Sequence, residues 1–225
     1  MFPETAVVTG ARGGIGRALV AALEAEGAEV RALDLVDGFD VSDLQAWVDV
    51  EPADLVCLNA GVLATGDGTI DDYRRILGVN VDGVVFGVQA LTPRMSPGSV
   101  FVVTASLAGL MPMESDPLYV LTKHAVVGYA RSMAPVLEPR GIRINLVCPG
   151  IVRTPMTEPA QASLDAAGFP LLEPAQIADA VLLAARSEET GQAWVCQPGR
   201  EPLKFRFPNV PGPRVAGAEG MVPQL

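Results

Sequence analysis

Tyr119 and Lys123 are the residues whose types and spacing most directly suggest chemistry, because they stand four residues apart in a sequence with three tyrosines and two lysines. On a helix this spacing places both side chains on one face. A free phenol has a pKa of about 10, and a nearby ammonium favours its ionised form, so such a pair can exchange a proton near neutral pH. The same pair is also common on ordinary helix surfaces, so its meaning depends on the rest of the chain.

A glycine-rich segment near the N-terminus predicts a dinucleotide site. The sequence TGARGGIG at residues 9–16 follows an apolar run and precedes a helical pattern. Glycines let the backbone turn tightly and approach a pyrophosphate, and a helix N-terminus offers free N–H groups and a favourable dipole. We predict that the residues of this loop that contact the dinucleotide are Gly10, Arg12, Gly13, Gly14, Ile15 and Gly16.

Asp34 stands 18 residues after Gly16, at the end of the second predicted strand. An acid at this position accepts hydrogen bonds from the adenosine ribose hydroxyls and repels a 2′-phosphate, which favours NAD over NADP. Arg12 and Arg31 keep NADP open as an alternative, because an arginine can neutralise a phosphate.

The elements that would hold these residues alternate along the chain. We expect strands at 5–9, 29–33, 54–58, 99–104 and 142–147, with a last strand at 193–196. We expect helices at 17–26, 69–95 with a break near Gly78, 117–137 and 174–186. Alternation of this kind predicts an α/β fold, a single-domain doubly wound parallel sheet with helices on both faces.

The chain divides into a domain at residues 1–197 and a tail at residues 198–225. The tail has six prolines and four glycines, so we expect it to be extended rather than helical. It also carries Phe205, Phe207, Val210 and Met221, which a wholly solvated segment seldom does. We therefore predict that part of the tail packs on its own subunit or on a neighbour.

Composition excludes several classes of function. Hydrophobic residues make up 49% of the 225 residues, which argues against a disordered chain. The net charge of −10 argues against nucleic acid or an anionic membrane as a partner. We expect no metal site, no secretory signal and no membrane span. The three widely spaced cysteines are predicted to be buried reduced thiols, which favours a cytoplasmic protein.

Taken in order, these motifs resemble those of the short-chain dehydrogenase/reductase family over residues 4 to about 199. Residues 9–16 resemble its TGxxxGxG cofactor motif. Asp40 and Val41 resemble its Asp-Val pair that meets the adenine. Asn59, Ala60 and Gly61 match most of its NNAG motif, with Leu58 in place of the first asparagine.

The second half of the resemblance covers the predicted catalytic residues. Asn80 and Ser106 match the family's catalytic asparagine and serine, and Tyr119 and Lys123 match its YxxxK motif. Its PG motif beside the nicotinamide is matched by Pro149 and Gly150, followed by Val152 and Thr154.

The chain also departs from the family's pattern in three places. Five residues separate Asp34 from Asp40, where the family usually has a helix and a strand, so this crossover must be abbreviated. The substrate lid between Pro155 and Pro174 is short, which predicts a more open substrate site. The proline-rich tail replaces the usual end of the chain.

The resemblance implies a Rossmann fold and hydride transfer between NAD(H), or less favourably NADP(H), and a carbonyl or secondary alcohol. Tyr119 would be the general acid in reduction and the general base in oxidation. Lys123 would lower the pKa of Tyr119 and hold the nicotinamide ribose. Ser106 would hydrogen-bond the substrate oxygen, and Asn80 would hold a water in a proton relay through Lys123.

Structural roles compete with several of these assignments. Ser106 could be a turn residue, Asn80 could bond helix backbone at a kink, Thr154 could cap a helix, and Asp40 could cap a helix that begins near Ser42. Leu107, Met111, Met113 and Met156 suggest an apolar substrate or ordinary packing.

Two other functions and an oligomeric state follow from the resemblance. A cofactor-binding regulatory protein without turnover would usually lack Tyr, Lys or Ser, and all three are present. An epimerase or dehydratase on the same fold is the other alternative. The family's interface helices correspond to 69–95 and 117–137, so we expect a homodimer or homotetramer.

Overall fold

The computed structural model describes residues 3–66, 68–209, 211–215 and 217. Its centre is a seven-stranded sheet in the order β2-β1-β3-β4-β5-β6-β7. The strands are β1 Thr5–Thr9, β2 Glu29–Leu33, β3 Leu55–Leu58, β4 Val100–Thr104, β5 Arg143–Pro149, β6 Ala193–Cys196 and β7 Leu203–Lys204. All neighbouring pairs except β6 and β7 are parallel. The predicted doubly wound α/β fold is therefore confirmed.

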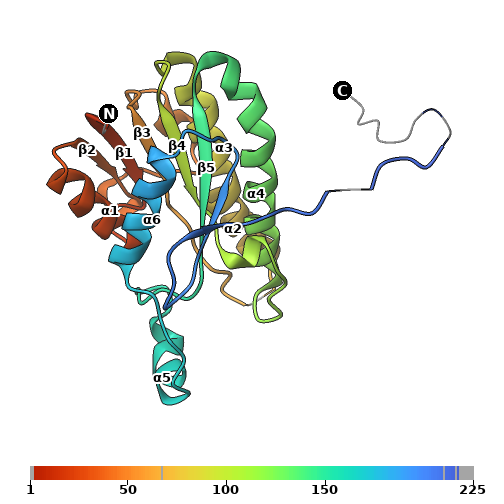
Figure 1. The fold of residues 1–225 in the computed structure, drawn as a ribbon. Coiled ribbons are helices and arrows are strands. Elements are labelled where there is room, and N and C mark those ends of the chain that lie inside the picture. The colour runs from red at the N-terminus through yellow and green to blue at the C-terminus, as the bar shows by residue number, and fades with distance from the viewer. Residues whose placement is uncertain (1–2, 67, 210, 216, 218–225) are drawn as a thin grey trace.

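Helices cover both faces of the sheet (Figure 1). On one face, α1 Gly14–Ala25 packs beside α6 Pro174–Arg186, above a cluster that includes Leu19, Leu23 and Ile177. On the other face lie α2 Ile70–Leu77, α3 Gly83–Leu91 and α4 Pro117–Leu137. The apolar strands predicted this arrangement, because β3 and β4 are buried along their whole length.

The predicted break near Gly78 is a change of helix type rather than a gap in the helix. Helices α2 and α3 are joined without interruption by a π-helical segment, Gly78–Asp82, and a 3₁₀ turn follows at Thr92–Arg94. By length and composition alone, the helix Ile70–Arg94 is apolar enough to cross a membrane. We read it as a core helix, because Val84, Val88 and Leu91 are buried against the sheet.

The strand at Ala193–Cys196 is not the last one, so that prediction was wrong. The chain turns back after β6 and pairs Trp194 with Lys204 in an antiparallel register. Phe205 continues this pairing by donating its N–H to the carbonyl of Ala193 at 2.8 Å. The short strand escaped prediction because the two residues Leu203 and Lys204 carry no recognisable alternation.

The beginning of the tail packs on its own subunit, as predicted. Phe205 and Phe207 contact the core cluster and meet edge to face, with ring centroids 4.9 Å apart. The guanidinium of Arg131 in α4 stacks on Phe207 at 3.6 Å from the ring centroid. Val210 and Met221, for which we made the same prediction, lie outside the described residues.

The crossover after β2 is as short as the sequence predicted. A single 3₁₀ turn at Leu35–Asp37 leads directly to Asp40. As a consequence β2 is an edge strand of the sheet, and Leu35 and Val36 are 68% and 76% exposed.

Helix α5, Glu158–Ala166, lies in the predicted lid and was not predicted as a helix. It projects away from the layers of the domain (Figure 1) and buries none of its residues. Its apolar residues are too few to mark a face, which explains why the pattern gave no signal.

Candidate active site

The first turn of α4 holds Tyr119 at the carboxyl end of the parallel sheet. Asp116 caps this helix by accepting a hydrogen bond from the N–H of Tyr119 at 2.8 Å, and Pro117 occupies the first helical position. The second carboxylate oxygen of Asp116 accepts a bond from the N–H of Ala64 at 3.0 Å. Asp116 therefore ties the first turn of α4 to the loop after β3.

Lys123 is buried one turn further along the helix, with 4% of its surface exposed. Its ammonium nitrogen donates to the carbonyl of Thr104 at 3.0 Å and lies 5.5 Å from the centre of the Tyr119 ring. Burial lowers the pKa of Lys123 to about 8.

Ser106 and Tyr119 are brought together as the sequence predicted. The hydroxyl of Ser106 lies close enough to the phenol to oppose the rise in the pKa of Tyr119. Ser106 has an extended backbone, and its hydroxyl also accepts a bond from the N–H of Ala108 at 3.1 Å. The serine thus caps the 3₁₀ turn Leu107–Gly109 while it faces the phenol, so the turn role and the site role coexist.

The pKa of Tyr119 differs from our expectation. Burial raises this pKa above its ordinary value, the hydroxyl of Ser106 opposes the rise, and the charge of Asp116 adds to it. We expected Lys123 to lower the pKa. In the structure the phenol is desolvated, and the ammonium of Lys123 bonds to Thr104 rather than to the phenol.

A chain of hydrogen bonds links Lys123 to the glycine loop. Asn59 donates to the carbonyl of Thr9 at 3.0 Å and accepts from the hydroxyl of Thr104 at 3.1 Å. The hydroxyl of Thr9 in turn accepts the N–H groups of Asn59 and Ala60, at 2.9 and 3.1 Å. Asn59 therefore bridges the ends of β1 and β4 across β3.

Both the amide nitrogen and the amide oxygen of the Asn80 side chain form hydrogen bonds within the protein. Its amide nitrogen donates to the carbonyl of Val62 at 2.9 Å and to the hydroxyl of Thr122 at 3.0 Å, and its oxygen accepts from the N–H of Val62 at 2.8 Å. Both amide hydrogens are thus used. These bonds go to the loop after β3 and to a side chain of α4 rather than to helix backbone at a kink, and the water relay stays a prediction.

The glycine loop has the shape that a dinucleotide requires. Gly10 has φ +63°, and a Cβ on Gly16 would stand 2.0 Å from the carbonyl oxygen of Gly10. A Cβ on Gly14 would stand 2.6 Å from the methyl group of Thr154. Backbone can approach a pyrophosphate here only because no side chains occupy these positions, so the residues present fit the predicted cofactor.

Asp34 adjoins this loop, as the NAD prediction requires. Its carboxylate accepts a hydrogen bond from the N–H of Arg12 at 2.8 Å and another from the N–H of Val36 at 3.2 Å. The guanidinium of Arg12 is paired with Asp37, at 2.7 Å between Nε and Oδ2. Arg31 donates to the carbonyl of Glu51 at 2.8 Å.

Asp40 and Val41, which we predicted to contact the adenine, have different roles in the structure. Asp40 accepts bonds from the N–H and the hydroxyl of Ser42, at 2.9 and 2.7 Å, and the cap of the next 3₁₀ helix is Asp43 rather than Asp40. Val41 is buried, and its side chain lies where a Cβ on Gly83 would meet it at 2.8 Å. The side chain of Val41 therefore belongs to the core.

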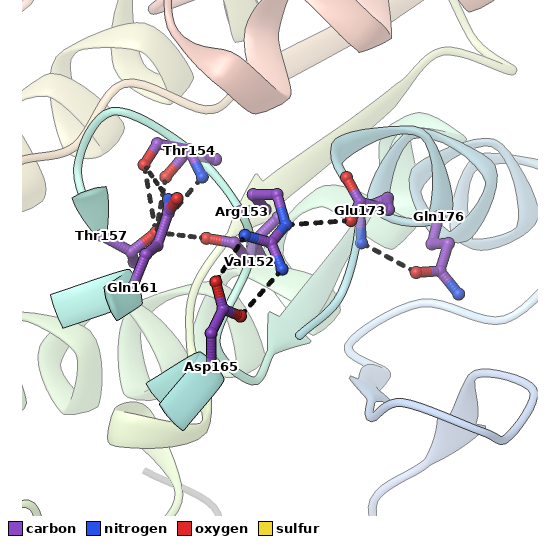
Figure 2. Close-up of polar contacts among 8 residues, drawn as sticks. All are labelled: Val152, Arg153, Thr154, Thr157, Gln161, Asp165, Glu173 and Gln176. Carbon is purple, nitrogen blue, oxygen red and sulfur yellow. Dashed lines mark hydrogen bonds and ion pairs between the residues drawn. The ribbon is translucent and has the colours of Figure 1, made fainter. Parts of the chain in front are cut away.

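The segment after Pro149 and Gly150 is held by a polar network at the base of the lid, which Figure 2 shows. Arg153 lies between two carboxylates, with ion pairs of 3.2 Å to Asp165 in α5 and 3.3 Å to Glu173 before α6. The hydroxyl of Thr157 donates to the carbonyl of Val152 at 2.5 Å.

Thr154 lies in the same network (Figure 2). Its carbonyl accepts from the side chain of Gln161 at 3.0 Å, and its N–H donates to Thr157 at 3.2 Å. The residue before α5 is Thr157, so Thr154 is not the helix cap.

Three residues of the site were missed by the sequence reasoning. Asp116 could have been found, because Asp-Pro before a helical pattern is an N-terminal capping signal. Thr122 and the buried Cys148 carry no such signal. Burial raises the pKa of the Cys148 thiol to about 12. All three cysteines are free and buried, as predicted.

Comparison with known families and proteins agrees with this geometry. The model of the short chain dehydrogenase family matches residues 34–165. The chain belongs to the short-chain dehydrogenase/reductase family. It is 32% identical over 237 residues to the 3-alpha-(or 20-beta)-hydroxysteroid dehydrogenase of Mycobacterium tuberculosis, covering 88% of this chain and 90% of the relative. It is 35% identical to the short-chain type dehydrogenase/reductase y4vI of Sinorhizobium fredii, of which it spans only 34%.

Solved structures of similar proteins hold different cofactors. A 3-oxoacyl-[acyl-carrier protein] reductase from Brucella melitensis with bound NAD has a TM-score of 0.74 and 29% identity, covering 85% of this chain and 88% of that one. BdcA in complex with NADPH has a TM-score of 0.77 and 26% identity, covering 85% and 92%. Proteins similar to this chain therefore bind either NAD or NADPH.

Proposed function

We propose that this short-chain dehydrogenase/reductase transfers a hydride between NAD(H) and a carbonyl or secondary alcohol carbon, with Tyr119 as the general acid and base. The observation that carries the proposal is the convergence of Ser106, Tyr119 and Lys123 at the carboxyl end of the sheet, beside the glycine loop. The bound nicotinamide would supply or accept the hydride.

The proton would move at the phenol oxygen of Tyr119. In reduction, the substrate oxygen takes this proton as the adjacent carbon receives the hydride, so the charge that develops on the oxygen is neutralised. Burial raises the pKa of Tyr119, so the phenol carries the proton that reduction would consume but releases it less readily than a free phenol. Ser106 would donate a hydrogen bond to the same substrate oxygen.

The preference for NAD rests on the surroundings of Asp34. The carboxylate lies at the end of β2, where it would accept bonds from the ribose hydroxyls and repel a 2′-phosphate. Both arginines that favoured the NADP alternative are occupied, Arg12 by Asp37 and Arg31 by the carbonyl of Glu51.

The substrate that fits this site best is an apolar ketone or secondary alcohol. Met111 and Met156, which the sequence suggested as substrate contacts, are 53% and 41% exposed, and thioether side chains adapt to apolar ligands. The Mycobacterium relative is by name a hydroxysteroid dehydrogenase, which agrees with an apolar substrate. We further propose a cytoplasmic homodimer or homotetramer, which the mass in solution at micromolar concentration would test.

The test is a titration of the purified protein with NADH and NADPH, followed by assays with a panel of ketones and secondary alcohols. We expect tighter binding of NADH and its net oxidation with an apolar ketone. Equal affinities would contradict the argument from Asp34. Cofactor binding without turnover of any carbonyl or alcohol would favour the regulatory alternative.

A further inference from the structure

Arg12 contacts two carboxylates, and one of them belongs to Asp34, the residue expected to select the cofactor. Its backbone N–H donates to Asp34 at 2.8 Å, and its side-chain Nε donates to Asp37 at 2.7 Å. The same arginine is therefore joined to both carboxylates of one turn, by its backbone to the first and by its guanidinium to the second.

The shortened crossover is what places Asp37 there. The 3₁₀ turn Leu35–Asp37 starts at Asp34, and the N–H of Asp37 donates to the carbonyl of Asp34 at 3.0 Å. Gly38 then reverses the chain with φ +90°. This tight turn points the Asp37 carboxylate back at the glycine loop, where it meets the arginine.

We propose that Asp37 is a specificity-determining residue, which holds the guanidinium of Arg12 away from a 2′-phosphate and so strengthens the preference for NAD over NADP. This inference rests on the proposed function, because it assumes that a nicotinamide dinucleotide binds at this loop.

The physical basis is competition for one cation. A 2′-phosphate beside Asp34 needs a nearby positive charge, and Arg12 is the guanidinium bonded to that turn. The ion pair with Asp37 is partly solvated, with side chains 53% and 43% exposed, so a phosphate could displace it. The hydrogen bond and charge of Asp37 also raise the pKa of Arg12.

Arg31 is a weaker candidate for the same role. It donates to the carbonyl of Glu51 at 2.8 Å, so it is directed toward the loop before β3 and away from the glycine loop. A cation released beside Asp34 would therefore be Arg12.

The experiment compares four proteins by equilibrium titration with NADH and with NADPH, read by cofactor fluorescence. In Asp37→Ala we expect NADPH to bind about 5- to 10-fold tighter than to the wild type, with NADH affinity changed less than about two-fold. The gain should shrink at high salt, because it is a surface electrostatic effect. In the double variant Asp37→Ala, Arg12→Gln the gain should disappear.

The matched control is Glu26→Gln. Glu26 pairs with Arg186 at 2.9 Å with similar exposure, 45% and 52%, but at the far end of α1 from the glycine loop. The substitution Glu26→Gln also removes one negative charge, and it should leave the ratio of the NADH and NADPH affinities unchanged.

The outcomes distinguish a failure of the proposed function from a failure of the inference about Asp37. If the wild type binds neither cofactor, the proposed function fails and this inference falls with it. If the wild type binds NADH and Asp37→Ala leaves NADPH binding unchanged, only the inference is overturned. A gain that persists in the double variant also overturns it, because Asp37 would then act through its own charge rather than through Arg12.

Discussion

The ammonium nitrogen of Lys123 lies 5.5 Å from the centre of the Tyr119 ring, and its hydrogen bond goes to the backbone carbonyl of Thr104. The pair is therefore adjacent but not bonded. Lys123 is more deeply buried than an ordinary lysine, and this burial lowers its pKa to about 8. The consequence can be measured without any ligand.

We expect Lys123 to raise the free energy of unfolding between pH 8 and pH 9, measured as the difference between the wild type and Lys123→Met. In this range the folded protein releases the proton of Lys123, whereas the unfolded chain keeps it up to the ordinary value of 10.5. The unfolded state then binds more protons at this group, so the contribution of Lys123 to stability increases with pH, by about 1 kcal/mol at pH 9. Urea denaturation at closely spaced pH values would measure the rise.

The matched variants are Lys123→Met and Lys204→Met. The difference between the wild type and Lys123→Met should grow by this amount, whereas Lys204→Met should follow the wild type, because Lys204 is more exposed and paired with Glu189. The three cysteines add an opposing trend of similar size to all three proteins, because burial raises the pKa of their thiols to about 12 while the unfolded thiols ionise from 9.0. A difference that does not grow between pH 8 and pH 9 would contradict the assignment.

Tyr119→Phe should abolish turnover and spare cofactor binding. Removing the phenol oxygen takes away the proton donor, and general acid–base catalysis contributes about 10²- to 10⁴-fold, so kcat should fall by at least about 10²-fold. Steady-state assays with NADH, together with an NADH titration, would separate the two effects.

Tyr129→Phe provides the control for this prediction. Tyr129 lies on the same helix, packs against the core, and has its pKa raised by burial like Tyr119. Its variant should keep the wild-type kcat. Activity retained by Tyr119→Phe would show that another group carries the proton.

Asn80→Ala should destabilise the protein rather than simply impair a proton relay. The substitution leaves the partly buried N–H and carbonyl of Val62 without their partner, while the hydroxyl of Thr122 keeps its bond to the carbonyl of Tyr119. Unsatisfied buried groups cost about 1–3 kcal/mol each, so for these two we expect a loss of roughly 2–4 kcal/mol in the free energy of unfolding.

Two variants of Thr122 refine the test. Thr122→Val removes one bond to Asn80 and should cost about 1–2 kcal/mol, whereas Thr122→Ser keeps the hydroxyl and should cost less. Wild-type stability in Asn80→Ala, combined with lost turnover, would favour the relay interpretation.

The sequence predicted the frame of the site because its signals are local. The helix at 117–137 and the strands at 5–9 and 29–33 have the predicted bounds, since Pro117, Gly27 and the apolar runs mark their limits. The order of the motifs identified the family. These features depend on residues a few positions apart.

The remaining features depend on contacts between distant segments. The pairing of Arg12 with Asp37 and the bonds of Asn80 to Val62 join residues whose types alone do not announce a partner. The raised pKa of Tyr119 comes mainly from burial, which spacing cannot show. Strand β7 exists because β6 offers an edge, not because two residues form a pattern.

We expect substitutions in the glycine loop to have different effects, because its glycines face different neighbours. A Cβ on Gly14 meets the methyl carbon of Thr154 at 2.6 Å, and this side chain can move. A Cβ on Gly16 meets the carbonyl oxygen of Gly10 at 2.0 Å and the Cα of Ala11 at 2.8 Å, and backbone atoms cannot yield. We therefore expect Gly14→Ala mainly to weaken NADH binding, by roughly 10-fold, and Gly16→Ala to lower the free energy of unfolding by about 3 kcal/mol.

Rescue distinguishes the two cases. Adding Thr154→Ser to Gly14→Ala removes the nearest contacting carbon and should recover part of the NADH affinity, whereas nothing at position 154 should help Gly16→Ala. Gly128→Ala in α4 is the control, since a Cβ there meets no atom within 4 Å and should stabilise the helix by up to about 1 kcal/mol. If Gly16→Ala binds NADH and unfolds like the wild type, the close packing of the loop on its own backbone is refuted. Titration of the samples measures the NADH affinity, and urea denaturation measures the free energy of unfolding. Because of the loop geometry, we expect Gly14→Ala to change mainly the first and Gly16→Ala mainly the second.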